Sequence, residues 1–229
     1  MKQLNPGSSV RLPGVSADHS DSAPDIPTNR RVLLIRHGQT EWSLTDRHTG
    51  RTDIDLTARG EEDARALAGI ADRLGLVSPF VFASPRTRAR RTAQLAGLSV
   101  DQVDDRFAEW DYGDYEGLTR LQIHADGDPD WTIWTGGGPH GESVEDMVAR
   151  VDGAVDLVEE RLVDSDVIIV SHGHFSRSFV CRFLGWPIGQ GAEIDLRPAG
   201  AALLMQLGQD RRLCALVGPE GAAATHLAV

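Results

Sequence analysis

The chain has 229 residues, and its 34 acidic against 23 basic side chains give a formal net charge of -11. This balance argues against a nucleic-acid partner, because affinity for the phosphate backbone comes from clustered lysine and arginine, and against a basic helix lying on a membrane. No stretch reaches the ~20 apolar residues of a membrane span, and two cysteines are too few for a disulfide framework and fit a reducing cytoplasm.

The first 30 residues differ in composition from the rest of the chain. They include Pro6, Pro13, Pro24 and Pro27 but no aromatic residue, so they cannot bury enough apolar surface to offset the entropy lost on ordering. We expect residues 1–30 to form a disordered tail and residues 31–229 to form a single domain. The tail lacks the apolar run of roughly 7–15 residues that marks a secretory signal.

Strands are predicted where the sequence is apolar without interruption. Such runs are typical of strands covered on both faces, and they lie at Val32–Ile35, Phe80–Ala83 and Val167–Val170. Two further strands, Ala201–Leu207 and Arg211–Val217, are predicted to close the sheet as an antiparallel hairpin around Gln209-Asp210.

Helices are predicted between these strands from apolar residues spaced three or four apart. Four are predicted: one begins after Thr57, one covers about Arg86 to Leu95, one begins at Ser143, and one runs through Phe179 and Phe183. The buried stripes are predicted at Ala64, Leu67, Ala68, Ala71 and Leu74 for the first helix and at Val144, Met147, Val148, Val151, Val155, Val158 and Leu162 for the third. This alternation predicts an α/β fold, a three-layer α/β/α sandwich around a mostly parallel sheet with an antiparallel edge.

Polar motifs follow the three apolar strands directly. They read Arg36-His37-Gly38, Ser84-Pro85-Arg86-Thr87-Arg88 and Ser171-His172-Gly173-His174. Ligands of open α/β sheets bind beyond the carboxyl ends of the strands, and the N-terminus of a following helix favours an anion. Two histidines and several arginines at one edge of the sheet therefore predict a phosphate site.

The chemistry of phosphoryl transfer uses these side-chain types. A neutral imidazole can attack phosphorus and become a phosphohistidine, and guanidinium groups match phosphate oxygens and stabilise developing charge. A carboxylic acid can protonate the leaving alcohol and then activate water. Glu109 is the candidate acid, since the segment from Glu109 to Gly117 holds both tyrosines of the chain and aromatic surroundings favour a neutral carboxyl by desolvation.

Five strings occur in the order of a known family: RHGQTEWS, SPRTRARRTA, EWDYGDYEG, GESVEDM and VSHGHFSR. From about Arg31 to at least Arg177 the chain resembles the histidine phosphatase superfamily, whose fold is phosphoglycerate-mutase-like. It is similar to actinobacterial acid phosphatases of this family. The EWDYGDYEG and SHGHFSR strings and a Trp-x-x-Trp insertion also resemble the sedoheptulose-bisphosphatase branch.

The resemblance implies roles for individual residues. His37 matches the phosphorylated nucleophile, and Glu109 matches the proton donor. Arg36, Arg88 and His172 match the rest of the phosphate pocket. Substrate or phosphate contacts are expected from Arg36, Ser43, Thr49, Gly50, Arg88, Tyr112, Gly173 and His174.

Departures from the family pattern bear on the reaction. Ser43 and His174 stand where the mutases have asparagine. The paired arginines that mutases carry in their insertion are absent from residues 126–141, which favours hydrolysis, although Tyr112 and Arg120 match substrate-contacting positions of the mutases.

Some residues keep a second interpretation. A metal site at His37, His172 and His174 is disfavoured, because no carboxylate or cysteine accompanies them at a familiar spacing, and we expect neither metal nor cofactor. Arg177 either supports the pocket or pairs with an acid, and His48 is expected to be an ordinary residue.

The proton donor and the insertion also admit more than one interpretation. Asp111 and Glu116 lie near Glu109 and could serve as the acid in its place. Trp131 and Trp134, in the irregular segment of residues 126–141, either form the core of that segment or cover the substrate.

The sequence thus predicts a cytoplasmic phosphatase that hydrolyses small phosphomonoesters through phospho-His37, of acid phosphatase or sugar-bisphosphatase type. A phosphoglycerate mutase is the alternative enzyme, and a non-catalytic phospholigand-binding module is the alternative of another class. The expected partner is a small phosphorylated metabolite, with no nucleic acid or membrane, and the resemblance allows a homodimer.

Overall fold

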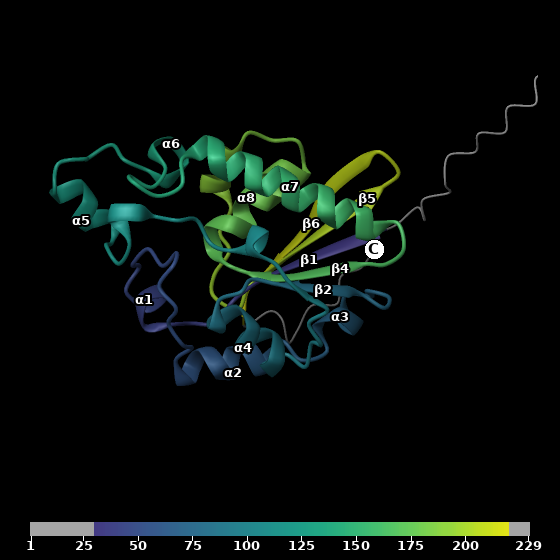
Figure 1. Cartoon of the computed structure of the whole chain (residues 1–229). Coiled ribbons are helices and arrows are strands. Elements are labelled where there is room, and N and C mark those ends of the chain that lie inside the picture. The colour runs from purple at the N-terminus through teal and green to yellow at the C-terminus, as the bar shows by residue number, and fades with distance from the viewer. Residues whose placement is uncertain (1–29, 220–229) are drawn as a thin grey trace, which may run out of the picture.

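A six-stranded sheet runs through residues 30–219, the part of the chain that the computed structural model describes (Figure 1). Its strand order is β3-β2-β4-β1-β5-β6. The first four strands are parallel to one another, β5 is antiparallel to β1, and β6 is antiparallel to β5. The strands are β1 (Arg30–Arg36), β2 (Phe80–Ala83), β3 (Gln102–Val103), β4 (Val167–Ser171), β5 (Ala201–Leu207) and β6 (Asp210–Val217).

Helices connect the strands and cover both faces of the sheet. They are α1 (Glu41–Leu44), α2 (Ala58–Ala66), α3 (Ile70–Arg73), α4 (Thr87–Leu95), α5 (Arg120–Ala125), α6 (Ile133–Gly136), α7 (Val144–Leu162) and α8 (Gly173–Phe183), with 3-10 turns η1 (Asp105–Phe107), η2 (Gly113–Tyr115) and η3 (Ile188–Glu193). Figure 1 shows α2, α3 and α4 on one face and α7 and α8 on the other. The predicted three-layer α/β/α sandwich with an antiparallel edge is therefore confirmed.

Strand β1 shows why the apolar runs are buried on both sides. Successive side chains of a strand point to opposite faces. Leu33 and Ile35 pack in one cluster with Leu67 and Ala93, whereas Val32 and Leu34 pack in the other with residues of α7 and α8. None of the β1 side chains from Val32 to Ile35 is exposed.

The helix predicted after Thr57 is shorter than its apolar spacing suggested. Thr57 caps α2 as expected, since its hydroxyl accepts from the Gly60 N–H at 3.0 Å. The helix ends at Ala66, however, and Gly69, with φ at +73°, separates it from α3. A left-handed glycine is a common helix terminator, and the break exposes Ala68 and buries Ile70 instead.

The other predicted elements lie close to their expected positions. Ser143 caps α7, and the side chains of Met147, Val151, Val158 and Leu162 are buried as predicted. The closing hairpin is confirmed, but its turn is Gly208-Gln209, one residue earlier than expected, because Gly208 supplies the positive φ of +60°.

Some features of the fold carry no clear signal in the sequence. Strand β3 has only two residues, too few to give a pattern, and the insertion contains the short helix α6. The tail predicted for residues 1–30 lies outside the described residues except for Arg30. None of the helices within residues 30–219 is both long and apolar enough to cross a bilayer.

The register of the sheet brings the polar motifs together. Arg36 at the end of β1 pairs with Ser171 of β4, and Ala83 at the end of β2 pairs with Val170. The motifs that follow these three parallel strands therefore begin at one edge of the sheet, as predicted.

Two glycines allow the segment after β1 to pack against α2. A Cβ on Gly60 would collide with the carbonyl oxygen of Gln39, and one on Gly38 would collide with the carbonyl oxygen of Gly60. Because both obstacles are backbone atoms, no side-chain movement can relieve them. The position of the chain next to His37 is thus set by direct backbone contact.

We expect Gly60→Ala to lower the free energy of unfolding by about 1–3 kcal/mol, as overpacking in a close-packed region does. The matched control is Gly153→Ala in α7, where a Cβ would meet nothing within 4 Å. An alanine there should raise the free energy of unfolding by roughly 0.5–1 kcal/mol. Urea unfolding of the two variants measures both values, and changes of the same sign and size would contradict the packing argument.

Candidate active site

A cavity of about 190 Å³ opens where β1 and β4 end and α8 begins. Eight of the residues that the sequence predicted for the site line it: Arg36, His37, Ser43, Thr49, Glu109, Tyr112, Gly173 and His174. The remaining walls come from Asp46, Arg47, His48 and Arg177. The other predicted residues, Gly50, Arg88 and His172, form a hydrogen-bonded layer next to it, in which Arg88 bonds to both of the others and the His172 ring meets that of His37.

His37 is held in the form that a nucleophile needs. Its Nδ1 lies 2.7 Å from the carbonyl oxygen of Gly38, and because a carbonyl only accepts, Nδ1 carries the proton and Nε2 keeps its lone pair. Burial, followed by the positive charges of Arg88 and Arg36, holds the pKa of His37 well below 6.5. The imidazole is therefore neutral near pH 7.

Arg36 presents a guanidinium that the protein does not saturate. One terminal nitrogen donates to the carbonyl oxygen of Leu196 at 2.8 Å, but its buried Nε has no hydrogen-bond partner among the described residues. A Cβ on Gly173 would lie 3.1 Å from Cζ of Arg36. Gly173 therefore contributes space for this guanidinium, and an anion placed beside it would find an unused donor.

Arg88 and His172, which the sequence assigned to the phosphate pocket, bond to each other. Arg88 Nε donates to His172 Nδ1 at 3.2 Å, so the proton of the neutral ring is on Nε2, which lies 2.7 Å from Ser84 Oγ. Burial and then Arg88 lower the pKa of His172 well below 6.5. The rings of His172 and His37 meet edge to face at 5.2 Å.

Glu109 follows η1 in the chain, lies against the N-terminus of α8 and is almost fully buried. Its carboxyl oxygens accept hydrogen bonds from the N–H groups of Trp110 at 3.0 Å, Phe175 at 2.8 Å and His174 at 3.0 Å. These donors fix the orientation of the carboxyl group, so its aromatic neighbours do not leave it without polar partners. Glu109 and His37 face the same cavity.

Comparison with known proteins gives a consistent result. The model of the histidine phosphatase superfamily, branch 1, matches residues 32–217. The chain belongs to the histidine phosphatase superfamily. It is a phosphatase enzyme.

Named relatives include both phosphatases and mutases. An acid phosphatase of Mycobacterium tuberculosis is 45% identical over 175 residues, 76% of this chain and 86% of the relative. A sedoheptulose 1,7-bisphosphatase of Saccharomyces cerevisiae is 32% identical over 191 residues, 71% and 70% of the two chains. A 2,3-bisphosphoglycerate-dependent phosphoglycerate mutase of Methylobacterium radiotolerans is 33% identical over 194 residues, 79% and 91% of the two chains.

The fold is shared with solved structures. The structure of an open-reading-frame product of Mycobacterium tuberculosis superposes with a TM-score of 0.79 at 43% identity and covers 82% of this chain and 96% of its own. The resemblance to this superfamily and to its acid phosphatases is thus confirmed.

Residues 48–53 carry the predicted substrate contacts Thr49 and Gly50 and are called the substrate loop for that reason; two charged side chains from elsewhere in the sequence hold this segment in place. Arg88 donates to the carbonyl oxygens of Thr49 and Thr52, both at 2.9 Å. Glu116 accepts from the N–H groups of Gly50 and Thr52, both at 3.0 Å. Glu116, a candidate acid at the level of sequence, therefore holds the loop, and the Gly50 N–H is bonded to it.

Two smaller predicted contacts also have protein partners. The Ser43 hydroxyl accepts from the Thr40 N–H at 2.8 Å and lies 3.0 Å from the Thr40 carbonyl oxygen, as part of the capping box of α1. The Thr49 hydroxyl donates to the Arg47 carbonyl oxygen at 3.1 Å. Arg120, a mutase-type position, is exposed on α5 and is not part of the cavity wall.

The far wall of the cavity is aromatic and hydrogen-bonded. Burial, and then the charge of Glu109, raise the pKa of Tyr112 well above 10, so its hydroxyl stays protonated, and it lies 2.6 Å from His174 Nδ1. Burial and then Arg177 lower the pKa of His174 well below 6.5. His174 is therefore neutral, and its contact with the Tyr112 hydroxyl fits either tautomer of the ring.

Sequence reasoning missed His48, whose ring lies 4.7 Å from that of Tyr112. Its Nδ1 donates to the Leu118 carbonyl oxygen at 2.8 Å. The signal that marks it is its position next to Thr49 in the substrate loop. Trp131 is buried in the insertion, whereas Trp134 packs against His174 with ring centres 5.4 Å apart.

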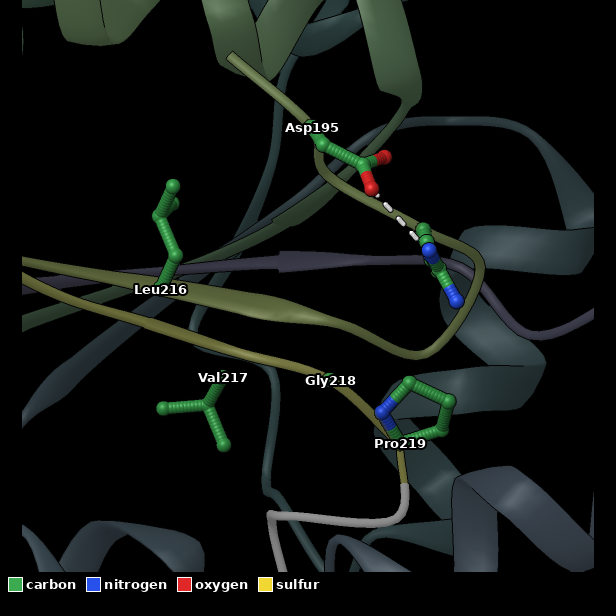
Figure 2. Close-up of a pocket in the computed structure, with 6 residues that line it drawn as sticks. Asp195, Leu216, Val217, Gly218 and Pro219 are labelled. Atoms are coloured by element: carbon green, nitrogen blue, oxygen red, sulfur yellow. Dashed lines mark hydrogen bonds and ion pairs between the residues drawn. The ribbon is translucent and has the colours of Figure 1, made fainter.

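A different hollow, of about 290 Å³, lies beyond the end of β6 (Figure 2). Its charged side chains, Asp195 and Arg197, form an ion pair at 3.1 Å. Most of its other lining residues are apolar, namely Leu216, Val217 and Pro219. It contains no histidine and is not joined to the motifs. Within residues 30–219, no three histidine, cysteine, aspartate or glutamate side chains are placed to share a metal ion.

We expect Glu116→Ala to lower kcat/KM for a generic aryl phosphate by about tenfold, since leaving partly buried N–H groups without an acceptor costs on the order of 1–3 kcal/mol. The loss should fall mainly on kcat, because the loop positions Arg88. Glu116→Gln retains one acceptor oxygen and should lose less. The matched control is Asp114→Asn, whose carboxylate pairs with exposed His140, and an equal loss in that variant would contradict the assignment.

The three buried neutral histidines make folding sensitive to acid. The pKa values of His37, His172 and His174 are lowered in the folded state, so below pH 6.5 the unfolded chain binds more protons and stability falls as pH falls. Each residue adds a slope of up to about 1.4 kcal/mol per pH unit. His174→Asn should remove one such contribution between pH 6.5 and 5, as urea unfolding measures, and an unchanged slope would contradict this assignment.

Proposed function

We propose that this histidine phosphatase hydrolyses small phosphomonoesters through a phosphohistidine formed on His37. The observation that carries the proposal is the state of His37: neutral, with Nδ1 bonded to Gly38 and Nε2 left as a lone pair beside the cavity. Arg88 and Arg36 supply positive charge that acts directly on His37.

In the first step, the Nε2 lone pair attacks phosphorus and a nitrogen–phosphorus bond forms. The bond between phosphorus and the ester oxygen breaks, and the protonated carboxyl of Glu109 transfers its proton to the leaving alcohol oxygen. Arg36 and the layer formed by Arg88 and His172 stabilise the charge on the transferring group.

In the second step, water replaces the alcohol. The Glu109 carboxylate takes a proton from a water molecule, whose oxygen attacks phosphorus while the nitrogen–phosphorus bond breaks. Inorganic phosphate leaves, and His37 and Glu109 return to their starting states.

The substrate is proposed to be a small phosphorylated metabolite. The limited volume of the cavity and the names of two relatives, an acid phosphatase and a sugar bisphosphatase, support this class. We propose that residues 31–229 act as one catalytic domain, and cytoplasmic location and homodimer formation stay predictions of the sequence.

A phosphoglycerate mutase is the second candidate. It is supported by a mutase relative at 33% identity and by Tyr112 in the cavity wall. The absence of any arginine or lysine from residues 126–141 and the position of Arg120 outside the cavity favour hydrolysis.

His37→Ala should lower the rate of hydrolysis of p-nitrophenyl phosphate by about 10³-fold or more, because the nucleophile acts as one unit with its neighbours. EDTA should have no effect. Because the pKa of His37 is lowered, its protonation should not reduce kcat/KM between pH 7 and pH 6. The control is His140→Ala, whose side chain is exposed and does not line the cavity.

Product analysis separates the candidate functions. Free phosphate from 3-phosphoglycerate supports the phosphatase, whereas its 2-isomer supports the mutase. Near wild-type hydrolysis by His37→Ala would rule out the mechanism, and ester binding without turnover by the wild-type protein would favour the non-catalytic module.

A further inference from the structure

One of the five strings in the sequence, GESVEDM, has no part in the proposed reaction. It covers residues 141–147, at the start of α7, and none of its residues lines the cavity that contains His37. Its first residues instead form hydrogen bonds with the segment that carries Glu109. The string therefore contacts the proposed proton donor from outside the cavity.

Glu109 lies on a stretch of backbone that no helix or strand supports. The turn η1 ends at Phe107 and η2 begins at Gly113, so residues 108–112 belong to no regular element. Their backbone groups still need partners, because a buried polar group without one is costly. Carbonyl oxygens on and before Glu109 find the same partner, which is the side chain of Arg150 in α7.

Arg150 holds this segment through a single guanidinium group. Its terminal nitrogens donate to the carbonyl oxygens of Arg106 at 2.9 Å, Ala108 at 2.8 Å and Glu109 at 3.4 Å. A guanidinium is planar and presents its donors in fixed directions, so one rigid group fixes three points of an irregular backbone. Its central carbon lies 5.8 Å from the ring centre of Phe175, the residue whose N–H donates to the Glu109 carboxyl group.

Glu142, in the same string, holds the backbone on the other side of Glu109. Its carboxylate accepts two hydrogen bonds from Arg150, both at 2.7 Å, and one from the Asp111 N–H at 3.3 Å. Its carbonyl oxygen accepts from Nε1 of Trp110 at 2.8 Å, and its N–H donates to the Asp111 carbonyl oxygen at 2.9 Å. The ion pair therefore joins the chain before Glu109 to the chain after it.

The neighbours of Glu142 make this arrangement possible. A Cβ on Gly141 would lie 2.4 Å from the carbonyl oxygen of Asp111, so the absence of a side chain lets the two segments lie this close. Ser143 caps the N-terminus of α7, and Arg150 lies about two turns further along that helix. The string thus begins α7 directly against the segment that carries Glu109.

We infer that Arg150, held by its ion pair with Glu142, is a positioning residue for Glu109. By fixing the backbone on both sides of Glu109, the pair keeps the carboxyl group within reach of the leaving oxygen, where a displacement of about 1 Å costs on the order of 10²-fold in rate. This inference rests on the proposed function, because it takes Glu109 as the proton donor. Neither member of the pair lines the cavity.

The test uses two aromatic esters that differ in their need for an acid. The alcohol of benzyl phosphate leaves poorly and depends on a proton from Glu109, whereas p-nitrophenyl phosphate releases an anion that is stable by itself. The ratio of their kcat/KM values, benzyl over p-nitrophenyl, therefore reports the acid. Because kcat/KM covers only the steps up to release of the alcohol, hydrolysis of the phosphohistidine does not enter this ratio.

Arg150→Met should lower the ratio by about tenfold or more, because a displaced acid loses much of a contribution of about 10²–10⁴-fold. Arg182→Met is the matched control. Arg182 of α8 also donates two hydrogen bonds to one carboxylate, that of Asp152 in α7, at 2.6 and 2.9 Å. Its ratio should equal that of the wild type, and an equal fall in both variants would show a general loss of packing and overturn the inference.

A double variant tests whether Arg150 acts through Glu109. Glu109→Gln removes the acid and should lower the ratio by itself. Adding Arg150→Met should lower it no further, because residues that act as one unit are not additive. A further fall, or an unchanged ratio in folded Arg150→Met, would overturn the positioning role. An unchanged ratio in Glu109→Gln would instead overturn the proposed role of Glu109 as the acid.

Two milder variants replace Arg150→Met if it does not fold, since the ion pair is largely buried and breaking such a pair is destabilising. Arg150→Lys keeps the charge without the planar fork, and Glu142→Gln keeps one acceptor oxygen. Each should lower the ratio, and an unchanged ratio in both would overturn the inference.

Hydrogen exchange tests the positioning without turnover. The amides of Trp110 and Asp111 should exchange faster in the variants of Arg150 and Glu142 than in Arg182→Met, because the backbone on both sides of Glu109 is released. Equal exchange in all of them would contradict the inference even if the proposed reaction is correct.

Discussion

The arrangement of the site depends on one buried guanidinium. The Arg88 side chain is fully enclosed and bonds to three carbonyl oxygens of the substrate loop and to the imidazole of His172. Asp53, at the end of the same loop, binds the first turn of α4 through Thr87 at 2.9 and 2.7 Å. Segments following β1, β2 and β4 are thereby joined around a positive charge before any ligand arrives. Such preorganised charge is what stabilises a transferring phosphoryl group.

The positive interior of the site contrasts with the charge of the whole chain. The formal net charge is -11, yet Arg36, Arg88 and Arg177 gather at one cavity and its histidines are neutral. Small ligands respond to the local field and to donor geometry, whereas large polyanions respond to the charge of the surface. The combination suits a compact phosphoester and disfavours a nucleic acid.

Features with a local sequence signal could be predicted. The apolar runs before Arg36 and His172 predicted two strands. Because those strands were expected to be parallel, the motifs at their carboxyl ends were expected at one edge of the sheet. Features that depend on distant contacts could not: Glu116 holds Gly50 across 66 residues, and Ser84 holds His172 across 88. The apolar spacing also predicted one continuous helix across Gly69, where the structure has two, because a single glycine hardly changes the pattern of apolar residues. The far wall of the cavity was hidden for the same reason, since His48 contacts Trp131 and Arg177 contacts Trp134 only in the folded insertion.

The position of β1 in the sheet has a consequence for motion. Strand β1 lies between β4 and β5, and the backbone of His37 is bonded on both sides, to Ser171 at 2.8 Å and to Ala199 at 2.9 Å. Amides in such central strands open only with global unfolding, whereas exposed loops open locally. His37, the proposed nucleophile, thus belongs to the slowest-exchanging part of the protein, and the exposed wall around Asp46 and Arg47 belongs to a faster one. In the proposed mechanism, substrate entry and phosphate release then need only this wall to open, while the His37 imidazole stays in place.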